Sequence, residues 1–126
     1  MGIGINIELD ENAIAKLQAA VLPAAEETIE ALRTDVVAAQ VMPFDMGDMQ
    51  NNQTFTATEE DGGEITSHLV TGSPQARRLY YHPEYNFQKV NNPNAGGLWL
   101  EPWLNGDKKN FVQDTFAKNY KKEAGV

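Results

Sequence analysis

The carboxylates most suited to metal binding stand in a poor pattern for it. Asp45 and Asp48 lie on either side of Gly47, and Asp61 follows in a sequence typical of a turn. A calcium loop needs oxygen ligands at alternate positions and a terminal glutamate, which this spacing does not supply. We therefore expect solvated carboxylates, with no bound metal and no other cofactor.

The histidines and serines offer no catalytic pairing either. His68 lies in a strand-like run, and His82 precedes Pro83. Ser67 and Ser73 lack the glycine-flanked turn that exposes a serine nucleophile. The chain has no cysteine, which excludes disulfides, thiolate catalysis and cysteine-bound zinc. We expect a protein that is not an enzyme and has no small-molecule substrate.

Charge divides unevenly along the chain. Residues 1–64 carry 13 acidic and 2 basic side chains, residues 65–126 carry 5 and 8, and the net charge is −8. Duplex DNA needs a basic footprint, so this balance argues against DNA as the main ligand. The split fits two solvated faces of opposite sign, or an acidic side of one copy that meets the basic side of the next. No apolar run approaches the roughly 18 residues of a membrane span.

The length predicts a single domain, residues 1–126, with a core of its own. Residues 3–9 alternate isoleucine or leucine with small or polar side chains, which predicts a strand. From about residue 11 to residue 41, apolar side chains recur every three or four positions, which predicts one long helix with Asp10 as its N-cap. Pro23 interrupts the stripe, so a kink is expected there. The stripe includes Ile14, Leu17, Val21, Ile29, Leu32 and Val36.

The middle of the chain predicts a loop followed by a hairpin. Residues 43–52 are rich in turn formers, and we expect this loop to become ordered only on assembly. The runs 53–58 and 64–70 are rich in β-forming residues and flank an Asp-Gly turn signal, which predicts a β-hairpin. Because an isolated hairpin is only marginally stable, the long helix should pack across an antiparallel sheet that contains it. The fold class is therefore α+β.

The last third predicts one more helix and a long irregular stretch. Residues 75–81 fit a short helix or a strand equally well, and residues 82–97 are too rich in turn formers to hold an element. A C-terminal helix is predicted from about residue 105, with lysines on one face and apolar or aromatic side chains on the other. The latter are Phe111, Val112, Thr115, Phe116 and Tyr120.

Residues 73–104 form an unusually aromatic segment that holds both tryptophans and four of the six prolines. Aromatic side chains bring a large contact area with few rotatable bonds, which suits a core or a protein interface. Trp99 and Trp103 are separated by Glu101-Pro102. We expect one tryptophan to anchor the core and the other to lie nearer the surface.

Several stretches resemble a known family. Residues 41–49 look like the "vPyDTGxL" loop that follows the first helix in phage minor capsid proteins, which are similar to the tail-completion or head–tail joining proteins of long-tailed bacteriophages. Met46 and Met49 stand where threonine and leucine are usual. The order of elements also fits. The later blocks that match are 76–83, 85–88, 92–95 and 99–103.

The resemblance implies a non-enzymatic structural protein of a phage or prophage virion, in the connector ring, or neck, between portal and tail. It implies an assembly route through the host cytoplasm to the head–tail junction. The implied partners are further copies in a ring and neighbouring neck or tail proteins, while DNA passes through without sequence-specific binding. The residues also leave open a small protein-binding module that uses the aromatic segment 79–103 as its recognition surface.

An assembly interface is expected in two places. The first is the loop after the long helix. The second is a pair of arginines that would face glutamates of the adjacent copy, since charge pairs at a rim set orientation and association rate. The residues are Phe44, Asp45, Met46 and Met49 in the loop, and Arg77 and Arg78 opposite Glu26, Glu27 and Glu30.

Overall fold

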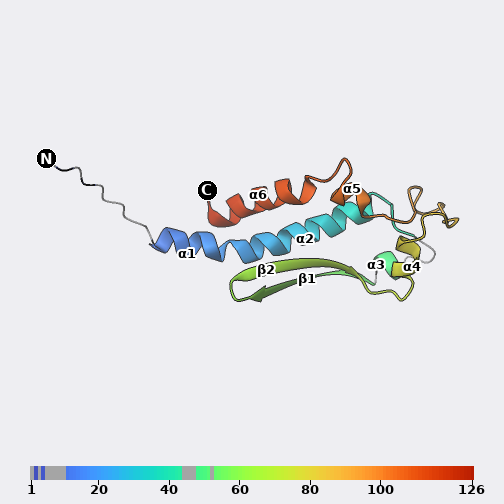
Figure 1. Ribbon diagram of the computed structural model, residues 1–126, viewed down its shortest axis with the longest axis horizontal. Helices are drawn as coiled ribbons and strands as arrows, with labels where there is room; N and C mark the ends of the chain where they lie inside the picture. The colour runs from blue at the N-terminus through green and yellow to red at the C-terminus, as the bar shows by residue number, and fades with distance from the viewer. Residues whose placement is uncertain (1, 3, 5–10, 44–47, 52) are drawn as a thin grey trace.

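The computed structural model describes residues 2, 4, 11–43, 48–51 and 53–126. The fold is α+β, as predicted. In Figure 1, α2 runs through the middle, with α6 along one side and the β1–β2 hairpin along the other, while α3, α4 and α5 gather at one end. The described elements are α1 (Glu11–Ala19), α2 (Val21–Ala38), α3 (Asp48–Asn51), β1 (Thr54–Asp61), β2 (Glu64–Thr71), α4 (Ala76–Tyr80), α5 (Glu101–Leu104) and α6 (Phe111–Ala124).

The long N-terminal helix bends close to the proline, as predicted. α1 ends at Ala19 and α2 begins at Val21, so Pro23 lies in the first turn of α2. A proline ring clashes with the carbonyl four residues earlier, here that of Ala19, and has no amide hydrogen to offer it. In a first turn this missing amide costs little, because such amides have no helical partner anyway. The bend therefore falls at Ala20, just before the proline.

The far end of α2 comes three residues earlier than predicted. The helix ends at Ala38, and Gln40 adopts a left-handed conformation with φ of 57°. A left-handed residue just past the last turn is a common way to stop a helix. The chain then turns, and the Met42 side chain enters the core.

The predicted hairpin is present and extends further than the β-forming runs. The strands pair from Thr54 opposite Thr71 to Asp61 opposite Glu64. The two central turn residues, Gly62-Gly63, have φ of 58° and 87°. A two-residue turn with two positive φ angles matches the right-handed twist of the strands, and glycine adopts it without strain.

The apolar stripe of the long helix is buried only along α2. Val36 and Ile29 are buried and Leu32 packs against the core, which confirms the predicted register. Ile14 and Leu17, on α1, are each 37% exposed. The hairpin face toward α2 is rich in hydroxyl groups, and its Leu69 contacts the core.

The two tryptophans share one environment, so the prediction of different roles was wrong. Trp99 and Trp103 are 5% and 6% exposed and belong to the same core cluster. The sequence pattern did not reveal α5, which begins just before Pro102. Trp103 lies in α5 and Trp99 in the turn just before it, and both indoles pack into the core.

Three other segments differ from, or refine, the sequence predictions. Residues 75–81, left open above, contain the helix α4. The loop predicted for 43–52 contains the one-turn helix α3. The C-terminal helix begins at Phe111 rather than near 105, because residues 105–110 form turns. The strand predicted at 3–9, the N-cap Asp10 and the interface residues Phe44, Asp45 and Met46 lie outside the described residues.

Candidate assembly surface

The stretches that carry the family resemblance meet at one end of the molecule, which we call the loop end (residues 39–43, 76–85 and 91–100). The amide of Leu98 donates to the carbonyl of Tyr80 at 2.8 Å, and that of Gly96 donates to Val41 at 3.2 Å. The rings of Tyr80 and Trp99 meet edge to face, with centroids 4.8 Å apart. Backbone pairing and aromatic packing thus join segments that lie far apart in the sequence.

A buried asparagine fastens the loop end to the chain that leaves α2. The side-chain amide of Asn92 donates to the Met42 carbonyl at 2.9 Å and to Gln50 Oε1 at 2.8 Å. Asn92 and Gln50 are both buried. Asn94 donates to the carbonyl of Ala39 at 3.0 Å and so occupies an acceptor at the end of α2. Sequence reasoning took these asparagines for turn formers, since only the tertiary contacts reveal their role.

A close backbone contact fixes the exit from α4. A Cβ at Gly97 would lie 2.8 Å from both the Cα and the nitrogen of Pro83. No side chain fits in that space, so the two backbones can touch only because residue 97 is glycine. The irregular segment between them is therefore held at both ends.

The loop end presents a group of cationic and aromatic side chains, which we call the α4 patch: Arg77, Arg78, Tyr81, His82 and Tyr85. Both arginines are exposed, and Tyr81 is 63% exposed. The rings of His82 and Tyr85 stack with centroids 4.7 Å apart. On a strand the arginines would point in opposite directions, but on α4 both reach solvent.

The histidine of the α4 patch also has an acidic neighbour. His82 Nδ1 lies 2.6 Å from Glu84 Oε1. This hydrogen bond holds the pKa of Glu84 below its usual value. The contact orients the His82 ring against Tyr85 and leaves the arginines as the uncompensated charges of the patch.

A hollow of about 410 Å³ opens beside the patch, between α4, the base of the hairpin and the end of α2. Its lining is mostly apolar and includes Met42, Leu69, Tyr80 and Trp99, with Arg77 as its charged member. The described residues that line it include no nucleophile paired with a base. A cavity with apolar walls can bury an apolar side chain of a partner protein.

The three predicted acidic partners are not equally available. Glu26 is exposed. Glu27 Oε2 lies 2.8 Å from Lys122 Nζ, and Glu30 accepts a hydrogen bond from the Thr56 hydroxyl. Two of the three carboxylates therefore already have partners within the chain.

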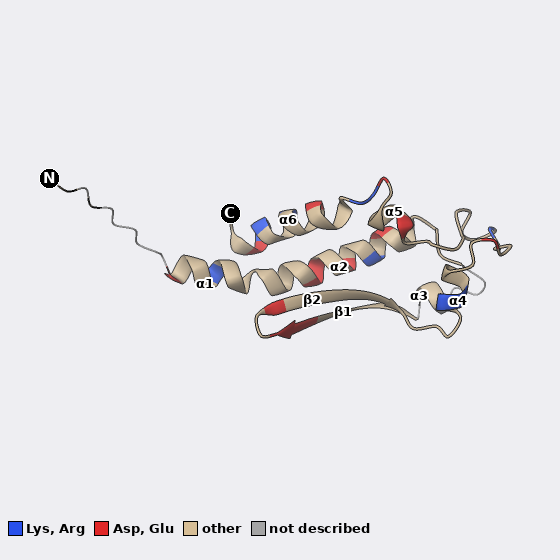
Figure 2. Cartoon of the chain, viewed as in Figure 1, with Lys and Arg blue, Asp and Glu red and all other residues tan. Residues whose placement is uncertain are grey.

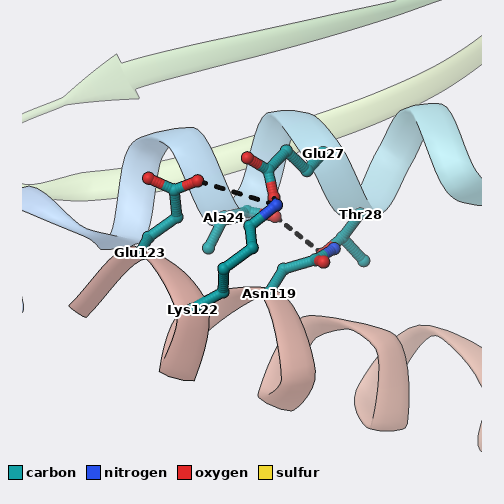
Figure 3. Close-up of polar contacts among 6 residues, drawn as sticks. All are labelled: Ala24, Glu27, Thr28, Asn119, Lys122 and Glu123. Carbon is teal, nitrogen blue, oxygen red and sulfur yellow. Dashed lines mark hydrogen bonds and ion pairs between the residues drawn. The ribbon is translucent and has the colours of Figure 1, made fainter. Parts of the chain in front are cut away.

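Figure 3 shows how the Glu27 contact joins α2 to α6. The hydrogen bond from Lys122 lowers the pKa of Glu27, and a hydrogen bond to Glu27 raises the pKa of Glu123. One turn away, Asn119 donates to the Thr28 hydroxyl at 3.2 Å, and that hydroxyl donates to the Ala24 carbonyl at 2.7 Å. This polar row links α2 to α6.

A second group of carboxylates is free of such contacts and lies at the other end of the hairpin from the α4 patch (Figure 2). We call it the acidic tip: Glu59, Glu60, Asp61 and Glu64. All four are exposed. The acidic tip and the α4 patch therefore place opposite charges at opposite ends of the hairpin. The charge counts hinted at this division, but the hairpin had to be placed before its direction was known.

Met49, expected at an interface, packs against the core from α3. In the described ranges, no group of three or more histidine, aspartate or glutamate side chains could hold a metal ion. No helix that the structure describes is both long and apolar enough to cross a membrane. Comparison of the chain with protein-family models, curated proteins and solved structures found no match.

Proposed function

We propose that the protein is a non-enzymatic structural component of a phage or prophage virion, part of the connector ring between portal and tail. The observation that carries the proposal is the α4 patch on its rigid loop end. Arginine and tyrosine are the residue types that most often supply binding energy at protein interfaces. They stand here on the segments whose sequences resemble the minor capsid family.

The charge arrangement supports a ring. A surface at one end of the molecule that fits a different surface at the other end makes a heterologous contact, and such contacts close into rings when the rotation allows it. We assign Arg77 and Arg78 of one copy to the acidic tip and Glu26 of the next. Glu27 and Glu30 are removed from this contact because each already has a partner in its own chain.

The test reverses both arginines. Arg77→Glu with Arg78→Glu should abolish head–tail joining in a complementation assay, leaving filled heads and free tails. The matched control reverses two exposed lysines of α6, Lys118→Glu with Lys121→Glu, which should leave joining intact. Normal infectivity of the arginine variant would contradict the proposed contact between the two arginines and the acidic tip.

A charge swap sharpens the test. Glu59→Lys with Glu60→Lys should restore joining to the arginine variant, because opposite charges then face each other again. Rescue by the swap would distinguish a direct contact from a general loss of solubility. Electron microscopy of the purified protein should show rings for the original chain and for the swapped variant.

The alternative, a small protein-binding module, draws on one specific observation. Tyr81 is exposed beside the apolar hollow, a combination that fits recognition of a single partner side chain. Such a module would remain monomeric in sedimentation at every concentration and would need Tyr81 but not the acidic tip. A requirement for both ends of the molecule favours the ring.

A further inference from the structure

A second surface, away from the α4 patch, lacks a partner. A groove of about 490 Å³ runs between α2, β2 and the first half of α6. Its lining is mostly apolar and includes Ala25, Ile29, Ile65, Val112 and Phe116. Polar side chains also line it, among them Gln113 of α6 and Lys109 in the turn before α6.

One wall of this groove is an open strand. β1 and β2 form a sheet of two strands, so in the described part of the chain β2 is paired on one side only. Asp61 and Glu64 flank a two-residue turn and form a hydrogen-bonded pair, after which such pairs alternate along the strands. The backbone groups of Ile65, Ser67 and Leu69 therefore point to the open edge.

This edge lacks the usual protection. β2 is eight residues long and contains no proline, lysine or arginine. Natural proteins normally cover, shorten or charge such an edge, because it templates the addition of another strand. The edge of β1 is better guarded, since Arg33 Nε donates to the carbonyl of Thr54 at 3.1 Å and acidic side chains follow.

The chain contains a segment of matching pattern. Residues 3–9 place isoleucine or leucine at every second position, with Gly4, Asn6 and Glu8 between them. A strand of this pattern has one apolar face and one polar face. Added to β2, it would lay the apolar face in the groove, turn the polar face to solvent and satisfy the open backbone groups.

Chain length decides which copy supplies the segment. From Glu11 to the level of Ala25 the helix rises roughly 21 Å at 1.5 Å per residue. Residues 3–9 span at most about 23 Å when extended. Within one chain the segment would be used up in reaching Ala25, with nothing left to lie along β2.

The position of α1 points the same way. All of its residues are exposed, and Figure 1 shows it extending past the ends of α6 and the hairpin. α1 makes some contacts with α6, such as the hydrogen bond from the Tyr120 hydroxyl to the Leu17 carbonyl, but its apolar stripe stays exposed and can gain burial against another molecule.

We propose that residues 3–9 of one copy add as a third strand to the β2 edge of a neighbouring copy, with Ile3, Ile5, Ile7 and Leu9 in the groove. This strand exchange rests on the self-association in the proposed function and names the backbone contact that links the copies. A salt-sensitive charge contact and a salt-resistant strand contact would then act together.

Because the chain has no cysteine, engineered disulfides can test the geometry cleanly. Asn6→Cys protein would be mixed with Thr66→Cys or His68→Cys protein, both of which place the thiol on the solvent side of β2. Since added strands lie about 5 Å apart, oxidation should link the two chains at one of these positions. The double variant in a single chain should give linked oligomers and not an internal disulfide.

The matched control moves the thiol one strand further away. Ala57 lies opposite His68 on β1, so Ala57→Cys would stand about 10 Å from the added strand, beyond disulfide reach. Linkage at Ala57 instead of β2, or an internal disulfide in the double variant, would overturn the proposal. Rings that form without linkage at β2 would contradict strand exchange but would still support the proposed connector ring. A chain that stays monomeric and unlinked would contradict both proposals.

A pair of variants adds an independent measurement. Ile5→Asp with Ile7→Asp should weaken self-association at least tenfold, whereas Asn6→Asp, on the polar face, should leave it unchanged. Both should keep the melting temperature of the dilute monomer. Equal association of the two variants would contradict the proposed face.

Discussion

The indole of Trp103 donates its N–H to the carboxylate of Asp35 across 2.8 Å, although the two residues are 68 positions apart. Lys108 Nζ lies 3.6 Å from the same carboxylate oxygen and 4.8 Å from the centroid of the Trp103 ring. One acidic side chain of α2 thus positions a core tryptophan and the turn before α6. The contact links the last turn of α2 to the C-terminal third of the chain.

Removing that acceptor should be costly. Asp35→Leu leaves the indole N–H of Trp103 without a partner in a buried site, for which we expect a loss of about 1–3 kcal/mol in the free energy of unfolding. Asp35→Asn keeps an acceptor oxygen and should lose less. Urea unfolding gives both values. In a Trp103→Phe background the indole donor is absent, so Asp35→Leu should lower the free energy of unfolding by less. Equal losses in both backgrounds would contradict the hydrogen bond between Trp103 and Asp35.

The buried amide of Asn92 gives a second prediction. Asn92→Ala leaves the Met42 carbonyl and Gln50 Oε1 without their hydrogen-bond donor. It should lower the free energy of unfolding by roughly 2–3 kcal/mol. Asn92→Asp should be at least as harmful at neutral pH, because a carboxylate cannot donate to either oxygen. Asn91→Ala, at the exposed neighbouring position, should change stability by less than about 0.5 kcal/mol. Similar losses of stability at positions 91 and 92 would assign the effect to the turn and not to the hydrogen bonds of Asn92.

The left-handed residue after α2 predicts a stabilising change. Gln40 is exposed and has φ of 57°. Glycine adopts this conformation without the Cβ conflict, so Gln40→Gly should raise the free energy of unfolding by about 1 kcal/mol. Gln40→Ala keeps the Cβ and should give no such gain. A thermal shift assay can compare the two variants directly.

The ion pair between α2 and α6 predicts a pH dependence. The lowered pKa of Glu27 stabilises the fold above roughly pH 4.3, the ordinary glutamate value, and this contribution is lost as the pH falls through the lowered pKa. The raised pKa of Lys122 stabilises the fold below about pH 10.4 and is lost as the pH rises through the raised value. The raised pKa of Glu123 has the opposite effect, because it favours the fold as the pH falls, and so it reduces the loss of stability in acid that Glu27 causes.

Lys122→Met should therefore lower the melting temperature at neutral pH by a few degrees at most, since the pair is largely exposed and screened. The difference from the original chain should vanish in strong acid. Lys121→Met provides the matched change at the adjacent exposed position. A deficit that persisted unchanged into strong acid would assign the effect of residue 122 to packing.

Local chemistry accounts for what the sequence could predict. The hairpin follows from β-forming runs around a glycine turn, and the bend follows from Pro23, since both depend on residues close in the chain. The burial of Val36 follows from helical periodicity. These features need no knowledge of distant segments.

The loop end shows why the rest could not be predicted. The expectation that Trp99 and Trp103 differ assumed a chain restricted by Pro102. A proline is well placed near the start of a helix, however, and the turn at Trp99 together with α5 puts both rings in the core. Asn92 looks like any turn asparagine until Met42 and Gln50 are brought beside it. The α4 patch likewise depends on whether residues 76–80 are a helix or a strand, which their pattern leaves open.

The central place of α2 bears on how the chain is made. It packs against both the hairpin and α6, but it leaves the ribosome long before the tryptophans that cover Val36 and Met42. At translation rates of about 5–20 residues per second, those apolar side chains stay unburied for several seconds until the tryptophans are synthesised. A truncated product that stopped before Trp99 would never receive it. Such fragments should be the ones that chaperones hold and proteases clear.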